Sequence, residues 1–160
     1  MEIEKKFLVK EVPKHLEQYE KWEIEQCYLC QRPTIRARKK NDDYILTYKC
    51  RTAKEQGIKD VNVSIEEELP LTEDAYLHLR DKADGIVIAK TRYRIPYGKY
   101  MVELDVFHGE YEGFFLAEVE FPTVEESRSF MPPEWFGDDV SGNKKYTNSY
   151  MATQESKKNL

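Results

Sequence analysis

Cysteine and histidine are scarce in this chain, and neither forms a pattern that carries chemistry. The 160 residues include three cysteines and three histidines. An odd number of cysteines argues against a secreted disulfide framework, and Cys27 and Cys30 form a C-x-x-C without the second pair or the spaced histidines of a zinc site. The histidines are scattered along the chain. We therefore expect reduced structural thiols and no histidine catalysis.

Long apolar runs and an excess of positive charge are also missing. No stretch approaches the roughly 20 apolar residues of a membrane helix, and the charged start MEIEKK is unlike a secretory signal. Acidic residues outnumber basic ones by 30 to 25, which gives a net charge of -5, whereas nucleic-acid binders usually carry a basic face. These absences predict a cytoplasmic protein that binds neither a membrane nor nucleic acid. The acidic balance is compatible with divalent metal ions.

The length of 160 residues fits one domain with its own core. We expect this domain to span residues 1–153, followed by a flexible tail at 154–160. Cap and turn signals predict a few helices. The segment LTEDAYLHLRDKADG has Thr72 as N-cap and Gly85 as C-cap, and shorter helices are expected in VPKHLEQYEKW, TVEESRSF and KYTNSYMATQESKK.

Most of the remaining sequence alternates charged and apolar residues, as half-buried strands do. At the start, Glu2, Glu4 and Lys6 share one parity, and Ile3 and Phe7 share the other. The same alternation returns in PTIRARK, YILTYKC, VNVSIEEEL, IAKTRYRIP, YMVELDVF and FLAEVEF, with EIEQCYL as an eighth stretch that contributes Gln26 and Tyr28. Eight strands of this kind suit closure into a barrel.

The charged faces of these strands repeat residues of one sign, such as Glu-x-Glu, Arg-x-Arg and Lys-x-Arg. Like-charged side chains at this spacing repel each other unless a counterion or ligand lies between them. A merely solvated face would accept Ser, Thr, Asn and Gln as well. We therefore expect an α+β fold: an eight-stranded antiparallel β-barrel with a polar, charged lumen and helices packed on the outside. The alternative is an open antiparallel sheet whose charged face is simply wet.

A lumen that carries both signs of charge suits a ligand that also carries both. Carboxylates hold Mg²⁺ or Mn²⁺ as hard oxygen ligands, and Arg and Lys side chains hold phosphate oxygens. Metal-chelated polyphosphate has this character. A lipocalin-like carrier of apolar ligands would need an apolar lumen instead.

The N-terminal Glu2-x-Glu4-x-Lys6 resembles the E-x-E-x-K signature of the CYTH superfamily, the triphosphate tunnel metalloenzymes. The resemblance continues in order through QCYL, TIRAR, YILTYK, SIEEEL, AKTRYRI, VELDVF, AEVEF and PPEWFGDDVSGNKKYTN, from residue 1 to about residue 150. It implies an eight-stranded tunnel with helices outside, in agreement with the alternation. Among its members, the short bacterial inorganic tripolyphosphatases match this chain in length.

The resemblance also implies roles for individual residues. It assigns metal-binding carboxylates to Glu2, Glu4, Glu118 and Glu120, with Glu66, Glu68, Glu103 and Asp105 supporting them or holding a second ion. It assigns contacts to the triphosphate to Lys6, Arg36, Arg38, Lys49, Lys90, Arg92 and Lys144. Lys90, Glu4 and Glu120 are the candidate catalytic residues. Nearby Arg92 and Arg94 favour a neutral Lys90 amine, which leaves two roles open for Lys90: general base or phosphate ligand.

The function implied by the resemblance is metal-dependent hydrolysis of a small-molecule triphosphate, above all inorganic tripolyphosphate to pyrophosphate and phosphate, with one or two Mg²⁺ or Mn²⁺ ions. The alternatives are a class IV-type adenylate cyclase, a nucleoside triphosphatase, and a non-catalytic polyphosphate- or nucleotide-binding module. We expect a monomer or a homodimer.

Overall fold

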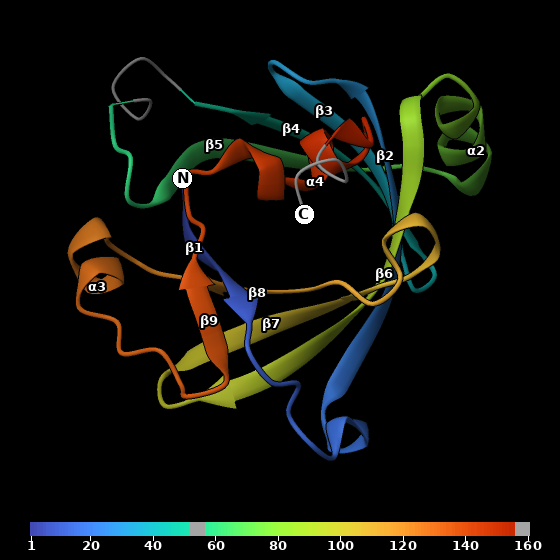
Figure 1. The fold of residues 1–160 in the computed structure, drawn as a ribbon. Helices are drawn as coiled ribbons and strands as arrows, with labels where there is room; N and C mark the ends of the chain where they lie inside the picture. Colours follow the sequence, from blue (N-terminus) through green and yellow to red (C-terminus); the bar gives the residue numbers. More distant parts are fainter. Residues whose placement is uncertain (52–56, 156–160) are drawn as a thin grey trace.

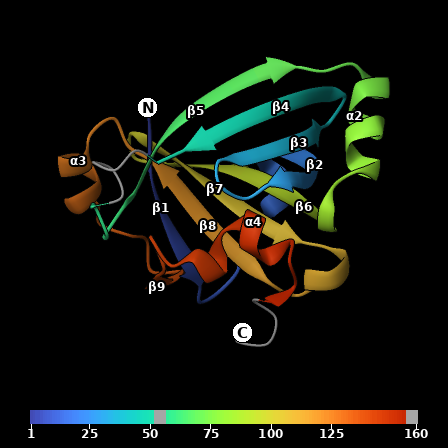
Figure 2. The ribbon, with the colours of Figure 1, turned by 90° about the horizontal axis from the view of Figure 1, so that it is seen from above.

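The strands close into a single barrel. The structure is a computed structural model that describes residues 1–51 and 57–155. Eight antiparallel strands are joined in the order β5-β4-β3-β2-β6-β7-β8-β1, and β1 pairs with β5 to close the ring. Figure 1 looks into this ring, and Figure 2 shows it turned by 90°. The predicted eight-stranded barrel is confirmed, and the open sheet is excluded.

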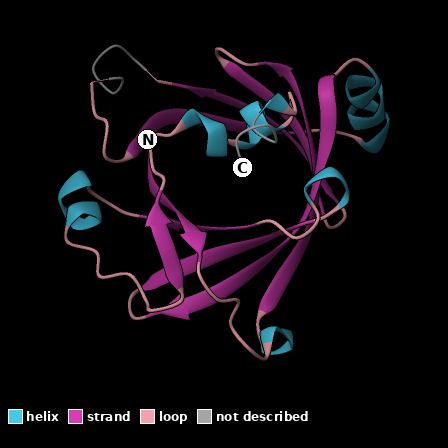
Figure 3. Ribbon diagram, in the orientation of Figure 1, coloured by secondary structure: helices cyan, strands magenta, loops and turns pink. Residues whose placement is uncertain are grey.

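The barrel strands are β1 (Glu2–Val9), β2 (Glu20–Cys30), β3 (Thr34–Lys40), β4 (Asp43–Cys50), β5 (Asn62–Pro70), β6 (Asp84–Tyr97), β7 (Tyr100–Phe107) and β8 (Phe115–Glu120). A short strand, β9 (Phe136–Asp139), pairs with the second half of β1. The helices are α2 (Glu73–Asp81), α3 (Val124–Arg128) and α4 (Asn148–Met151). Helices α2 and α3 lie outside the ring, and α4 lies at one end of it (Figures 2 and 3).

The register between strands keeps the charged residues on one face of the wall. Glu4 lies opposite Glu120 and Lys6 lies opposite Glu118 in the β1–β8 pair. Side chains alternate between the two faces of a strand, so the whole charged set points to the lumen once one member does. The inverted alternation expected from the sequence is thus built into the barrel.

The main hydrophobic core lies on the outer face of the barrel wall. It consists of Phe7, Ile95, Val102, Leu104, Ala117, Val119, Phe121 and Phe136. Phe130 and Trp135, from the segment between α3 and β9, pack against it from outside. On another side of the barrel, Tyr76 of α2 packs on Cys27 and Ala37. Segments outside the strands therefore shield the apolar outer face from water.

A further apolar cluster fills the lumen at the end where α4 lies. Ile88, Phe107 and Leu116 have the same parity as the charged lumen residues of their strands, and Tyr28 has the parity of Gln26. All four belong to one cluster with Met151 and Ala152 at the end of α4. The lumen therefore changes along its length from apolar side chains near α4 to charged side chains farther along the barrel.

Two hydrogen bonds fasten the end of α4 to the rest of the chain. Ile86 N donates to the Ala152 carbonyl at 2.8 Å, and the Tyr111 hydroxyl donates to the Met151 carbonyl at 2.7 Å. Gly85 has a φ of 67°, and a Cβ at this position would lie 2.1 Å from Ala152 O. Both the positive φ and the close approach require glycine.

The expected helices are confirmed in part. Thr72 caps α2 by accepting from Ala75 N at 3.1 Å, and α3 and α4 form within the predicted segments. The expected helix in VPKHLEQYEKW is wrong: this segment has only a 3-10 turn at Leu16–Gln18, and β2 begins at Glu20. Gly85 is not the C-cap of α2, which ends at Asp81, because this glycine already belongs to β6.

Two other expectations concern the cysteines and the C-terminus. Cys27, Cys30 and Cys50 are free thiols, as expected. Most of the expected tail, residues 156–160, lies outside the described residues. None of the helices within residues 1–51 and 57–155 has the length and the apolar character that crossing a membrane requires.

Candidate active site

A cavity of about 1060 Å³ occupies the lumen. All but one of the candidate residues line it: Glu2, Glu4, Lys6, Arg36, Arg38, Lys49, Glu66, Glu68, Lys90, Arg92, Glu103, Glu118, Glu120 and Lys144. They come from seven strands and from the turn before α4. The exception is Asp105, which is fully buried and does not line the cavity.

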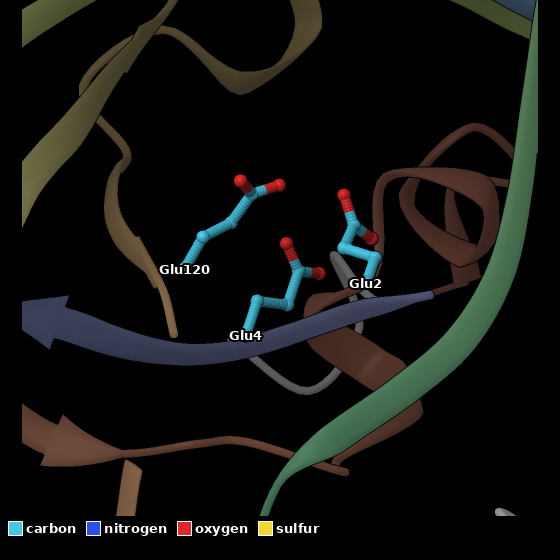
Figure 4. Close-up of side chains that lie close together, drawn as sticks. All are labelled: Glu2, Glu4 and Glu120. Carbon is cyan, nitrogen blue, oxygen red and sulfur yellow. The ribbon is translucent and has the colours of Figure 1, made fainter. Parts of the chain in front are cut away.

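Three carboxylates form the tightest acidic group of the cavity. One oxygen from each of Glu2, Glu4 and Glu120 lies within 4.8 Å of the others, and Figure 4 shows the three side chains converging from β1 and β8. Burial, a hydrogen bond to Glu2 and the charges of Glu2 and Glu103 raise the pKa of Glu120 to about 8. Burial also raises the pKa of Glu4. The donor set consists of hard oxygens that repel each other, and it fits a divalent cation such as Mg²⁺ or Mn²⁺.

Lys49 of β4 lies beside this acidic group. Its amine forms an ion pair with Glu2, and it lies 3.6 Å from Glu4 and 3.8 Å from Glu66. Burial lowers the pKa of Lys49, but the charges of Glu4 and Glu2 outweigh burial and raise it overall. Lys49 is therefore charged and lies at the boundary between the acidic and basic parts of the cavity.

Asp105 holds two of the cations instead of facing the cavity. Its Oδ1 accepts from Arg92 Nε at 2.7 Å, and its Oδ2 accepts from Arg92 Nη2 at 2.9 Å and from Lys90 Nζ at 2.8 Å. Burial disfavours the charged carboxylate, but Arg92 and Lys90 outweigh burial and lower the pKa of Asp105. The structure therefore does not place Asp105 with the other predicted metal ligands.

Lys90 is the most deeply buried cation of the site, with 2% of its surface exposed. Its Nζ donates to Asp105 and, at 2.9 Å, to Asn148 Oδ1. Burial lowers the pKa of Lys90 to about 7, with Asp105 opposing the shift and Arg92 adding to it. A substantial fraction of Lys90 is therefore neutral near pH 7.

Glu118 differs from Glu120, although both project into the lumen from β8. It lies 3.3 Å from Lys6 Nζ and 3.3 Å from Arg92 Nη2. Burial disfavours its charged form, but Lys6 and Arg92 outweigh burial and hold the pKa of Glu118 well below its usual range. Glu118 is thus neutralised by the protein's own cations. Glu103 also lies near cations, 3.4 Å from Arg92 and 3.5 Å from Arg94.

Arg36 and Arg38 on β3 present cationic groups without a carboxylate partner among the described residues. Arg36 Nη2 donates to Thr47 Oγ1 at 3.1 Å, and its buried Nε has no hydrogen-bond partner there. Arg38 Nε donates to Gln26 Oε1 at 2.9 Å. Two neighbouring guanidinium groups that face a cavity and lack an acidic partner are suited to an anion with several oxygens.

Three polar residues contact the candidate residues without having been assigned a role from the sequence. Gln26 was expected only to face the lumen, and Thr47 shares its parity with Lys49 on β4. Asn148 reaches Lys90 across a separation of 58 residues. Its position at the start of a short helix gave no signal of this contact. Lys144 lines the cavity, and its Nζ lies 5.4 Å from the centre of the Tyr150 ring.

Comparison with known proteins identifies relatives of this chain. No family model matches it. The inorganic triphosphatase of Nitrosomonas europaea is 33% identical over 157 residues, covering 94% of this chain and 96% of that protein. The inorganic triphosphatase of Acetivibrio thermocellus is 33% identical over 149 residues, covering 92% of this chain and 90% of that protein.

Solved structures agree with these relatives. The crystal structure of the inorganic triphosphatase NE1496 matches with a TM-score of 0.69 and 30% identity, over 96% of this chain and 95% of that one. A protein from Hippeastrum, named as a putative adenylyl cyclase with a dominant triphosphatase activity, shares the fold at 14% identity and a TM-score of 0.60, over 81% of this chain and 83% of that one. The chain belongs to the inorganic triphosphatases of the CYTH superfamily.

Proposed function

We propose that this protein hydrolyses inorganic tripolyphosphate to pyrophosphate and phosphate in the lumen of the barrel, with Mg²⁺ or Mn²⁺ as cofactor. The observation that carries the proposal is the division of one cavity into two parts: three crowded carboxylates, and the Arg36–Arg38 pair, which has no acidic partner within residues 1–51 and 57–155. A ligand that satisfies both parts has many anionic oxygens and a chelated divalent ion. The substrates named for the two curated relatives support the same class of ligand.

Glu2, Glu4 and Glu120 would hold the metal, with Glu66 and Glu68 on β5, the other strand that pairs with β1, as candidates for a second ion. Bound there, the ion would neutralise charge on the phosphate oxygens. Glu118 and Glu103, which pair with Lys6, Arg92 and Arg94, act instead by holding these cations in place. We therefore propose that Glu118 and Glu103 support the basic wall, meaning the cavity-lining Lys6, Arg36, Arg38 and Arg92, and do not bind the metal.

The basic wall binds and orients the substrate. Arg36 and Arg38 offer planar forks for phosphate oxygens, and Lys6 and Arg92 line the same cavity from other strands. Phosphoryl transfer depends chiefly on positioning and on stabilising charge, so fixed cations around an extended triphosphate supply most of what the reaction needs.

Lys90 is the proposed general base. A neutral amine has two N–H groups and one lone pair, and Asp105 and Asn148 accept the two N–H groups. The lone pair is left to accept the proton of a water molecule that attacks the terminal phosphorus. The bond from that phosphorus to the bridging oxygen breaks, and phosphate and pyrophosphate leave.

The central test replaces one carboxylate at a time and measures phosphate release from tripolyphosphate with Mg²⁺. We expect Glu120→Gln and Glu4→Gln each to lower turnover by at least about a hundredfold, because each loses a charged ligand. Glu67→Gln is the matched control, since Glu67 lies on β5 but on the outer face, and it should stay within about twofold of the original protein. Full activity in Glu120→Gln would contradict the proposed metal site.

The alternative activities are separated by their products. Purified protein given ATP forms cyclic AMP and pyrophosphate if it is a cyclase, and ADP and phosphate if it is a nucleoside triphosphatase. A binding module shows affinity for tripolyphosphate but no turnover with any divalent ion. We expect tripolyphosphate to rank first in a phosphate-release screen that also includes ATP, GTP and thiamine triphosphate.

A further inference from the structure

Two buried amides connect the cations of the cavity to the C-terminal segment. Gln26 on β2 is fully buried, and Asn148, the first residue of α4, is 8% exposed. Arg38 Nε donates to Gln26 Oε1 at 2.9 Å, and Gln26 Nε2 donates to Asn148 Oδ1 at 3.1 Å. Lys90 Nζ donates to the same Asn148 oxygen at 2.9 Å. A continuous chain of hydrogen bonds thus joins Arg38 to Lys90.

The chemistry of the two ends sets the direction of this chain. A guanidinium group only donates, so Gln26 must turn its oxygen toward Arg38. The Gln26 amide nitrogen then faces Asn148 and the Tyr28 hydroxyl, which lies 2.6 Å away. Asn148 must therefore present its oxygen, which is also the atom that Lys90 contacts. Turning over either amide would place donor against donor or acceptor against acceptor, so both orientations are fixed.

We propose that Gln26 and Asn148 are positioning residues for tripolyphosphate hydrolysis: they hold the Arg38 guanidinium and the Lys90 amine at a fixed spacing before the substrate arrives. This inference rests on the proposed function. Arg and Lys side chains lose much rotamer freedom when they are fixed against a ligand. Fixing them in advance reduces that loss at the moment of binding and so strengthens the binding of the triphosphate.

The same contacts make the site depend on the C-terminal segment. Asn148 enters the lumen only because α4 lies at the end of the barrel, where Met151 and Ala152 pack on the lumen cluster. Thr147 caps the helix by accepting from Tyr150 N at 3.3 Å, which sets the direction in which the first residue points. Helix α4 therefore closes one end of the barrel and, through Asn148, also supports the cations that bind the substrate.

The experiment uses Gln26→Met, Asn148→Leu and the double variant, with Tyr111→Phe as control. The first two remove the amides with little change of volume, whereas Tyr111→Phe loosens the same end of the chain without touching them. Two quantities are measured: KM for tripolyphosphate with Mg²⁺, and Kd for tripolyphosphate in EDTA. A loss of folded protein lowers the maximal rate but leaves both quantities unchanged.

We expect each single variant to raise KM and Kd by about tenfold, the range for a lost hydrogen bond to a charged group. The double variant should resemble either single variant, because residues that act as one unit are not additive. Tyr111→Phe should change KM and Kd by less than about twofold.

The inference is overturned if the KM and Kd values of both single variants equal those of the original protein, whatever happens to the maximal rate. It is also overturned if the effects multiply to about a hundredfold in the double variant, which would mean two independent contacts. If Asn148→Leu does not fold, Gln26→Met decides alone, since it breaks the same chain from β2. If the unmodified protein binds tripolyphosphate but does not hydrolyse it, the proposed function is wrong, and the Kd values alone test the positioning role. If it neither binds nor hydrolyses tripolyphosphate, both proposals are wrong.

Discussion

Arg92 and Asp105 form a two-point ion pair at the centre of the barrel wall, with Nε–Oδ1 at 2.7 Å and Nη2–Oδ2 at 2.9 Å. The pair fixes the plane of the guanidinium group, so that its remaining edge faces Glu103 and Glu118. Asp105 is completely buried. Both oxygens of Asp105 are taken up by Arg92 and Lys90, whereas a carboxylate that binds a ligand must keep an oxygen available. Asp105 therefore holds these two side chains in place.

Asp105→Asn tests this anchoring role. The substitution leaves the buried Arg92 guanidinium without its main counterion, and we expect the free energy of unfolding to fall by about 3 to 5 kcal/mol in denaturant titrations. Asp60→Asn is the control, because it breaks an exposed pair with Arg128 and should change stability little. Equal effects of the two substitutions would contradict the anchoring role.

The pH dependence of activity tests Lys90 as the base. With a pKa of about 7, the neutral fraction of Lys90 rises from about a tenth at pH 6 to about nine tenths at pH 8, so kcat/KM for tripolyphosphate should rise by about tenfold over this range. Lys90→Arg keeps the charge but cannot accept a proton, and the rise should disappear. If Lys90 only binds phosphate through its charge, activity should instead fall as pH rises through 7.

A cluster of Trp22, Lys40 and Arg94 lines the same cavity and predicts which triphosphates are accepted. Lys40 Nζ lies 4.1 Å and Arg94 Cζ lies 4.4 Å from the centre of the Trp22 ring. Lys40 and Arg94 belong to the strands on either side of β2, so we expect the two cations to cover opposite faces of the ring. A nucleobase then has no open face of Trp22 on which to stack, whereas the two cations attract the anionic oxygens of a polyphosphate.

Lys40→Leu should therefore lower KM for ATP by about tenfold, the gain expected when a base stacks on an aromatic ring, and should change KM for tripolyphosphate much less. Lys39→Leu is the control, because Lys39 is the neighbouring residue on the opposite face of β3. In the double variant Lys40→Leu/Trp22→Ala the gain should vanish. An unchanged preference between ATP and tripolyphosphate in Lys40→Leu would show that the cluster does not select the substrate.

Gly85→Ala tests how firmly the final segment is docked. The new Cβ would lie 2.1 Å from Ala152 O at a residue with φ of 67°, and we expect a loss of about 3 kcal/mol in the free energy of unfolding. Gly98→Ala is matched to it: the φ of Gly98 is 58°, but nothing lies within 4 Å of its added Cβ, so only the backbone strain of about 1 kcal/mol applies. Equal melting temperatures for the two variants would contradict tight docking.

The barrel and its charged lumen could be predicted because alternation records which side chains share a face. The grouping of Glu2, Glu4 and Glu120 was implied by the resemblance to the triphosphate tunnel family, since alternation alone does not place β1 beside β8. Alternation does not show how deeply a side chain is buried within the lumen. Asp105 and Glu103 alternate correctly, yet only Glu103 lines the cavity, because the pairing of Asp105 with Lys90 and Arg92 depends on the register of β6 against β7.

Contacts between distant segments also escaped the sequence pattern. Glu118 and Glu120 look equivalent on β8, but Lys6 lies opposite Glu118 while Glu4 lies opposite Glu120, and this single difference separates a paired carboxylate from a crowded one. The helix expected in VPKHLEQYEKW was wrong because the prediction gave more weight to the proline at its start than to the alternation of Trp22 and Ile24, which belongs to β2. Asn148 was overlooked because its partners lie on other elements.

The position of the main hydrophobic core outside the strands has a consequence for how this scaffold can evolve. In barrels that fill their interior with apolar residues, a new ligand chemistry disturbs the packing on which the fold depends. Here, interior positions that water reaches, such as Glu66 and Glu68, contribute little to that packing, so they can be exchanged with modest effects on folding. Substitutions that change the ligand are therefore tolerated best inside the barrel, and substitutions in the outer hydrophobic core are tolerated least.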